Sequence, residues 1–163
     1  MKKVIFLDRD GVINFNNGEY IYSLNNFKFN NGFFEALKFW HNLGYYFAII
    51  TNQGGISKGI YKKKDVIIIN KYLYYWFKLN NFNLLSILFC PHHNLIENCI
   101  CRKPNSLLLE KIIAKYDISV KNSFLIGDNF SDIQSGKKVG INSIKIRSNK
   151  SLNKVIHEYK HKW

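Results

Sequence analysis

Acidic residues are scarce in this 163-residue sequence, which holds 11 Asp and Glu against 24 Lys and Arg and carries a formal net charge of +13. Proline is scarcer still, at two residues, and no segment rich in proline, glycine and serine divides the chain. Hydrophobic residues make up 47% of the chain, which suffices for a buried core and excludes a disordered chain. We therefore expect one folded domain over residues 1–163.

Long apolar runs are also missing. The run Val4–Leu7 near the amino terminus ends at Asp8, and it is too short for the core of a signal peptide. The run LLSILF at 84–89 is far shorter than a membrane span. These absences predict a soluble, cytoplasmic protein with no membrane partner. The small size and the lack of a heptad pattern or an exposed apolar seam favour a monomer.

The excess of positive charge would suit a nucleic-acid partner. Lysines are, however, spread along the whole chain, while Asn, Ile, Phe and Tyr are abundant and Ala is scarce. This pattern indicates a compositional drift of the entire sequence. We therefore expect no dedicated nucleic-acid partner.

Short runs of β-type apolar residues alternate along the chain with amphipathic segments of helical period. This alternation predicts an α/β fold with a mainly parallel central sheet. Beyond Arg147 we expect only a short, frayed terminal helix. The expected strands are 4–7, 47–50, 86–89, 123–126 and 143–146, and the expected helices are 33–42, 63–78, 106–115 and 132–139.

The polar clusters DRD, TNQ, CPH and GDN each follow directly after one of these strands. Ligands of parallel sheets bind beyond the carboxyl ends of the strands, so the four clusters should meet at one site. Asp8 and Asp10, separated by one residue on an extended strand, would point the same way, and Asp128 would add a third carboxylate. Three convergent carboxylates favour a Mg²⁺ site that leaves room for a phosphate and waters.

Two further stretches can supply groups for an anion. TNQGG at 51–55 offers a hydroxyl, an amide and two glycines whose backbone N–H groups can be approached closely, and Arg102 and Lys103 offer positive charge. Each stretch alone is a weak signal, since a strand-to-helix turn and a pair of surface cations would look the same. Only their combination with the carboxylates points to phosphate chemistry.

In chain order, DRDGVIN, TNQGG, CRKP and GDNFSD resemble the four motifs of the haloacid dehalogenase superfamily of phosphotransferases. FLDRDGVIN, TNQGGISKG and CPHH with CICRKP look like its heptose bisphosphate phosphatase branch, and the resemblance covers residues 3–147. It implies a Rossmann-like haloacid dehalogenase fold, with helices on both faces of the sheet, a zinc-binding loop and no large cap domain. It also implies a small sugar phosphate as substrate: D-glycero-D-manno-heptose 1,7-bisphosphate, which loses its 7-phosphate during synthesis of ADP-heptose for the lipopolysaccharide core.

The resemblance assigns the chemistry to two aspartates. Asp8 would be the nucleophile that forms an aspartyl-phosphate, and Asp10 would protonate the leaving sugar oxygen and then activate water. Mg²⁺ would be bound by Asp8, by the backbone carbonyl of Asp10 and by Asp128. The chain departs from the branch at Asn129, where relatives often carry Lys or Arg, and in segment 14–27, which carries an extra residue.

The resemblance assigns phosphate and substrate contacts to four other residues. Thr51 and Asn52 would contact the transferring phosphoryl group. Lys103 would offset the negative charge of nucleophile and phosphate, and Arg102 would help to hold the substrate.

All three cysteines lie between residues 90 and 101, together with two histidines. Three cysteines cannot all pair with one another, and their clustering suits a metal ion in a reducing compartment. Cys90, His92, Cys99 and Cys101 form C-x-H and C-x-C pairs suited to tetrahedral Zn²⁺, and they match the zinc positions of the branch. Four protein ligands complete the coordination sphere, so this Zn²⁺ would be structural; His93 is left as a surface residue.

Two other functions fit parts of the pattern. Histidinol-phosphate phosphatases share the zinc loop and the four motifs, but CPHH and the ISKG after TNQGG favour the heptose branch. Polynucleotide 3′-phosphatases share the DxDG and TNQ-type motifs and lack the zinc loop. A zinc-dependent nucleic-acid module is a remote alternative, because the metal unit here lies inside an α/β domain and carboxylates repel a phosphate backbone.

Overall fold

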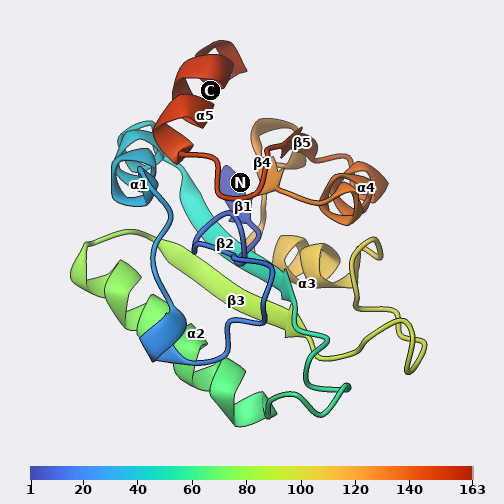
Figure 1. Ribbon diagram of the computed structural model, residues 1–163. Coiled ribbons are helices and arrows are strands. Elements are labelled where there is room, and N and C mark those ends of the chain that lie inside the picture. The colour runs from blue at the N-terminus through green and yellow to red at the C-terminus, as the bar shows by residue number, and fades with distance from the viewer. Residues whose placement is uncertain (163) are drawn as a thin grey trace.

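A computed structural model describes residues 1–162 and shows a five-stranded parallel sheet with strand order β3-β2-β1-β4-β5 (Figure 1). No helix within these residues has the length and apolar character needed to cross a membrane. The strands are β1 (Val4–Leu7), β2 (Tyr46–Asn52), β3 (Leu84–Cys90), β4 (Phe124–Gly127) and β5 (Asn142–Lys145). The helices are α1 (Phe33–Asn42), α2 (Lys63–Leu79), α3 (Leu107–Tyr116), α4 (Phe130–Lys138) and α5 (Leu152–Tyr159), with short 3₁₀ turns at Leu24–Asn26, Val120–Asn122 and Lys160–Lys162.

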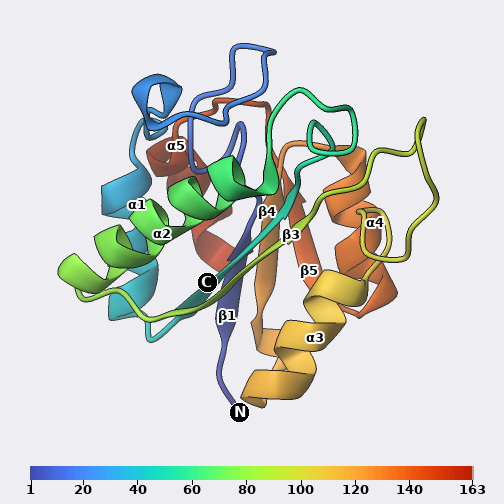
Figure 2. The same cartoon turned by 90° about the horizontal axis from the view of Figure 1, so that it is seen from below.

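The sheet is buried between two layers of helices, with α1, α2 and α5 on one face and α3 and α4 on the other (Figure 2). The central strand β1 shows why: its four residues are fully buried, and alternate side chains enter opposite cores. Ile5 and Leu7 pack with the first layer, whereas Val4 and Phe6 pack with the second. The predicted α/β class, with helices on both faces and without a large cap, is confirmed.

Strand β2 is longer than its apolar core suggested. The sequence predicts a strand over 47–50 that ends before TNQ, but Thr51 and Asn52 still pair with β3, opposite Phe89 and Cys90. Thr51 and Asn52 are therefore fixed by the sheet ladder at the carboxyl edge. The connections that follow β1, β2, β3 and β4 leave this same edge, as parallel pairing requires.

The expected short terminal helix is present as α5, but the expectation that it is frayed is wrong. Helix α5 packs against α1, and Leu152 and Val155 are fully buried in the same core as Trp40. The Leu152 N–H also donates to the Asn31 carbonyl at 3.0 Å. The apolar pair is spaced by three residues, so both side chains face the core although the segment is otherwise polar.

Shortening Leu152 should therefore weaken the whole domain. We expect Leu152→Ala to lower the free energy of unfolding by about 2–4 kcal/mol, because it removes a fully buried side chain and leaves a cavity. Urea unfolding followed by circular dichroism measures this. His157→Ala on the exposed side of α5 is the matched control and should change stability by less than about 0.5 kcal/mol. Equal, small effects of both changes would contradict the docking of α5.

Candidate active site

Lys103 lies at the centre of a buried charge cluster at the carboxyl edge of the sheet. Its ammonium donates to Asp8 Oδ1 at 2.7 Å and to the Ile50 carbonyl at 2.9 Å, and it also pairs with Asp132. Asp8 follows β1, and Asp132 lies in the first turn of α4. The predicted contact between Lys103 and the candidate nucleophile is thus present within hydrogen-bond distance.

Burial sets the electrostatics of this cluster. It raises the pKa of Asp8 to about 7; the Lys103 ammonium opposes the rise and the Asp132 carboxylate adds to it. Burial alone would lower the pKa of Lys103, but the carboxylates of Asp8 and Asp132 outweigh it and raise that pKa. Lys103 therefore stays protonated, and further positive charge near Asp8 would favour its ionised form.

Three carboxylates supply a place for that charge. Oxygens of Asp8, Asp128 and Asp132 lie within 4.8 Å of one another, and burial raises the pKa of Asp128 as well. An all-oxygen set of this kind fits Mg²⁺. The sequence analysis gives Asp8, Asp10 and Asp128 as the convergent carboxylates; within residues 1–162 the set of side-chain oxygens is completed by Asp132, and the Asp10 carbonyl as a ligand stays a prediction. The Asp132 carboxylate also accepts from the backbone N–H of Asn129, at the start of α4, at 3.0 Å.

The carboxylates of Asp8 and Asp10 are not a parallel pair on a strand, because β1 ends at Leu7 and the chain turns immediately after it. Both line the same cavity, but Asp10 has its own partners. Arg9 contacts both of its oxygens at 3.0–3.2 Å. Asn14 and Gln53 donate to it at 3.0 and 2.8 Å. Asp10 is thus held at the cavity by donors that do not contact Asp8.

The cavity in front of these aspartates has a volume of about 320 Å³. Its rim includes the segment between β1 and α1, which the sequence could not assign to the substrate. The Asn129 side chain, where relatives often carry a cation, donates to Asp128 Oδ1 at 2.7 Å. The lining residues are Asp8, Asp10, Asn16, Gly18, Glu19, Tyr20, Ile21, Thr51, Asn52, Gln53, Tyr61 and Asn129.

Asn52 and Arg102 have structural partners that the sequence did not reveal. The Asn52 amide accepts from the Lys103 N–H at 3.0 Å and donates to the Lys103 carbonyl at 3.1 Å, which fixes the backbone of Lys103. The Arg102 guanidinium donates to the His92 carbonyl at 2.9 Å, and it lines a neighbouring hollow with Asn52 and Lys103. Of the two cations, Lys103 contacts the carboxylates, whereas Arg102 braces the loop that carries it.

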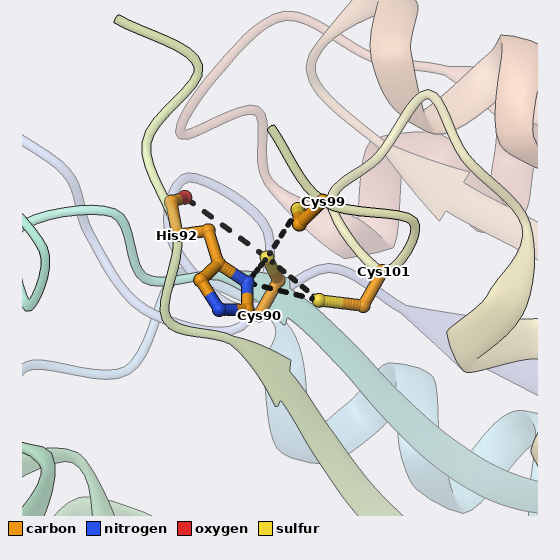
Figure 3. Close-up of side chains that lie close together, drawn as sticks. All are labelled: Cys90, His92, Cys99 and Cys101. Atoms are coloured by element: carbon orange, nitrogen blue, oxygen red, sulfur yellow. Dashed lines mark hydrogen bonds between the residues drawn. The ribbon is translucent and has the colours of Figure 1, made fainter. Parts of the chain in front are cut away.

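The four predicted zinc ligands converge on one point in that loop (Figure 3). Cys90 Sγ lies 3.6 Å from Cys99 Sγ and 3.1 Å from Cys101 Sγ, and His92 Nδ1 lies 3.2 Å from Cys101 Sγ and 3.5 Å from Cys90 Sγ. A tetrahedron with metal–sulfur bonds of about 2.3 Å has edges of about 3.8 Å, so the set is spaced for one Zn²⁺. His93 is outside it, and its Nδ1 accepts from the Leu95 N–H at 3.2 Å.

The thiols of this cluster are not equivalent. Burial raises the pKa of Cys90 and of Cys101. Burial acts in the same direction on Cys99, but backbone N–H groups of Arg102 and Cys101 and the two other thiols bring its pKa down to about 7. One thiolate is thus available near neutral pH, and metal binding would displace the remaining protons.

Several residues of the site were missed by the sequence reading. Arg9 lies between the two aspartates in the sequence and is fully buried, Gln53 was given no role of its own within TNQGG, and Tyr61 was not considered. Asp132, the last residue of the GDNFSD motif, was given no role. The spacing of Asp132 four residues after Asp128 was the one usable signal, because it places a carboxylate on the first turn of a helix that starts at the site.

Comparison with known proteins places this site in a family. A family model described as HAD-hydrolase-like matches residues 100–162. The D-glycero-alpha-D-manno-heptose-1,7-bisphosphate 7-phosphatase of Campylobacter jejuni is 39% identical over 142 residues, which are 87% of this chain and 80% of that protein. The D-glycero-beta-D-manno-heptose-1,7-bisphosphate 7-phosphatase of Helicobacter pylori strain 26695 is 44% identical over 135 residues, which are 82% of this chain and 77% of the relative.

A solved structure agrees in fold. The D,D-heptose 1,7-bisphosphate phosphatase of B. bronchiseptica, crystallised with magnesium and phosphate, superposes with a TM-score of 0.80 at 24% identity. The match covers 94% of this chain and 87% of that one.

Proposed function

The chain belongs to the heptose-1,7-bisphosphate 7-phosphatase family of haloacid dehalogenase-like hydrolases, and we propose that it is a Mg²⁺-dependent phosphatase that removes the 7-phosphate of D-glycero-D-manno-heptose 1,7-bisphosphate. The observation that carries this proposal is the buried contact of Lys103 with Asp8, which lines a cavity together with Asp10 and Thr51. A carboxylate paired with a fixed ammonium in this way is suited to attack phosphorus. The product would be heptose 1-phosphate, for ADP-heptose and lipopolysaccharide core synthesis.

The proposed reaction has two steps. Asp8 attacks the 7-phosphoryl group, the bond from phosphorus to the sugar oxygen breaks, and Asp10 gives its proton to that oxygen. Asp10 then takes a proton from water, which attacks the aspartyl-phosphate and releases phosphate. The Thr51 hydroxyl and the Lys103 ammonium stabilise charge on the phosphoryl oxygens, and phosphoryl transfer depends mainly on such positioning and electrostatics.

Two metal ions belong to this proposal. Mg²⁺, held by Asp8, Asp128 and the Asp10 carbonyl, would supply the positive charge that offsets the carboxylates and the phosphate. Zn²⁺ at Cys90, His92, Cys99 and Cys101 would have no open position, and its role would be structural. We further propose that the protein acts as a cytoplasmic monomer on small sugar phosphates, without a nucleic-acid or membrane partner.

A substrate panel tests the function. Phosphate release is measured with and without Mg²⁺ from both anomers of the heptose bisphosphate, from histidinol phosphate and from a 3′-phosphorylated oligonucleotide. We expect Mg²⁺-dependent release from the heptose bisphosphate, with a kcat/KM at least about tenfold above that for histidinol phosphate, because the two differ in the groups next to the leaving oxygen. Faster release from histidinol phosphate, or release only from the oligonucleotide, would overturn the assignment in favour of that substrate.

A further inference from the structure

A single side-chain amide links Asp10, the proposed acid for the leaving oxygen, to Thr51, the proposed contact of the phosphoryl group. Gln53 is buried at the cavity, and its side-chain amide makes four hydrogen bonds. Its Nε2 donates to Asp10 Oδ2 at 2.8 Å and to Thr51 Oγ1 at 2.9 Å. Its Oε1 accepts from the Tyr61 hydroxyl at 2.8 Å and from the Arg9 guanidinium at 3.1 Å. Every donor and acceptor of the amide is used by a residue at the site.

The neighbours leave the amide only one orientation. A guanidinium can only donate, so the Gln53 atom that contacts Arg9 must be the oxygen. The Tyr61 hydroxyl donates its own proton to the same oxygen, which agrees with this orientation. Burial raises the pKa of Tyr61 to about 12, which keeps that proton in place at neutral pH. The nitrogen of Gln53 must then face Asp10 and Thr51.

Tyr61 is itself fixed in position. A Cβ atom at residue 55 would lie 2.1 Å from the Tyr61 ring, so only glycine lets the ring approach this closely. On another side the Tyr22 ring stacks on it, with centroids 5.2 Å apart. Tyr61 is nearly fully buried as a result. The second glycine of TNQGG, Gly55, thus makes room for the Tyr61 ring, which the motif alone did not predict.

Arg9 also holds Asp10 in position. Its buried guanidinium contacts both oxygens of Asp10 and the Ile21 carbonyl, the latter at 2.7 Å. The Arg9 guanidinium is charged and the Gln53 amide is neutral, and both donate to the Asp10 carboxyl group. Asp10 therefore has one charged and one neutral support.

We propose that Gln53 and Tyr61 are positioning residues for Asp10: Tyr61 fixes the Gln53 amide, and the amide holds the Asp10 carboxyl group where its proton reaches the leaving sugar oxygen. The proposal rests on the phosphatase function given above. It also gives Thr51 a direction. Because Thr51 Oγ1 accepts from Gln53, the hydroxyl proton of Thr51 must point elsewhere, and the cavity lies beside it.

The test uses the need of the leaving group for a proton. A sugar alkoxide leaves slowly unless it is protonated, whereas p-nitrophenolate leaves without a proton. We expect Tyr61→Phe, which keeps the ring, to lower kcat/KM for the heptose bisphosphate about tenfold and that for p-nitrophenyl phosphate less than about twofold, since misplacing a general acid removes part of a contribution of about 10²–10⁴. A merely structural role would lower both equally, and equal losses would overturn the proposal.

A double-mutant cycle gives a second, independent result. Gln53→Met removes the amide that links Tyr61 to Asp10, so adding Tyr61→Phe to it should change kcat/KM for the heptose bisphosphate no further. A further tenfold loss in the Gln53→Met protein would show that Tyr61 acts by another route. Tyr22→Phe is the matched control, because its hydroxyl makes no hydrogen bond within residues 1–162, and it should match the wild type. If the wild type released no phosphate from the heptose bisphosphate, the proposed function would fail instead.

Discussion

Asp8→Asn should abolish phosphate release and leave the fold intact. The amide keeps the size and shape of the carboxylate but cannot attack phosphorus, so we expect kcat to fall by at least about 10⁴-fold. The Asp8 side chain is almost fully buried, yet we expect the fold to tolerate the loss of its charge. Lys103 keeps Asp132 as a partner, and the net negative charge of the buried cluster disappears. Steady-state phosphate release and thermal melting measure the two effects.

The difference in stability between this variant and the wild type should change with pH in a defined direction. The pKa of Asp8 is raised to about 7 by burial, above the ordinary value of 3.8, so the folded protein holds this proton more tightly than the unfolded chain does. The stability that the proton contributes is complete below pH 3.8 and is lost as the pH rises through about 7. In Mg²⁺-free buffer, Asp8→Asn should therefore gain Tm relative to the wild type as the pH is raised from about 5 to about 8.

Asp117→Asn is the matched control, since Asp117 is exposed and pairs only with the chain terminus among residues 1–162. It should retain full activity and show no such gain. Appreciable phosphate release by Asp8→Asn, in a preparation free of other phosphatases, would remove Asp8 as the nucleophile.

The fold was largely predictable because the buried strands are continuous apolar runs. The run Val4–Leu7 suits a strand that is buried on both faces, and the alternation of strands with helical segments favours parallel pairing. Strand ends were less predictable: Thr51 and Asn52 are polar, yet the ladder with β3 holds them in β2. The terminal helix was misjudged because two buried residues, Leu152 and Val155, anchor a segment whose composition is mostly polar.

The resemblance to the heptose branch, found from four motifs, is confirmed by relatives such as that of Helicobacter pylori at 44% identity. The motifs also identified Lys103 and Asp8, which meet across 95 positions of sequence. The motifs did not predict which residues contact each of these side chains. Asp132 rather than Asp10 joins Asp8 and Asp128, and this depends on where the chain turns after β1.

Partners of this kind come from tertiary packing. The Arg9 side chain could have faced solvent, as most arginines do, and only the segment around Ile21 closes over it. Gln53 reads as a turn residue until Tyr61 folds back onto it. No periodic pattern or motif spacing in the sequence indicates either contact, so neither could be predicted from a single sequence. The roles assigned to the site residues remain predictions that the variants above test.

Removing the metal from the cysteine loop should lower stability and activity together. Cys101 lies two residues before Lys103, and the loop is otherwise fixed at this point by the Asn52 amide and by the contact of Arg102 with His92. Without a metal ion, the convergent thiols would repel once ionised, and the exposed apolar side chains of Leu95, Ile96 and Ile100 show that the loop has little core of its own. Folding of small metal loops draws its free energy from the ion.

We therefore expect the wild type to contain about one Zn²⁺ per chain and Cys101→Ser to contain much less. Cys101→Ser should lose at least about 3 kcal/mol of unfolding free energy, and kcat should fall with it, because the Lys103 ammonium is no longer held against Asp8. His93→Ala is the matched control: this histidine is adjacent to a ligand but outside the cluster, so zinc content, melting and activity should stay at wild-type levels.

The pairing of effects is what separates a structural from a catalytic Zn²⁺. A catalytic ion would be lost with activity while melting changed little, and an adventitious ion would be lost with no effect on either. Full activity and unchanged melting of the zinc-free protein would refute the structural role. If both are lost, Lys103→Met shows how the loop acts. This change should lower kcat less in the Cys101→Ser protein than in the wild type, because two changes that break the same contact are not additive. That result would show that the loop acts by holding Lys103 in place.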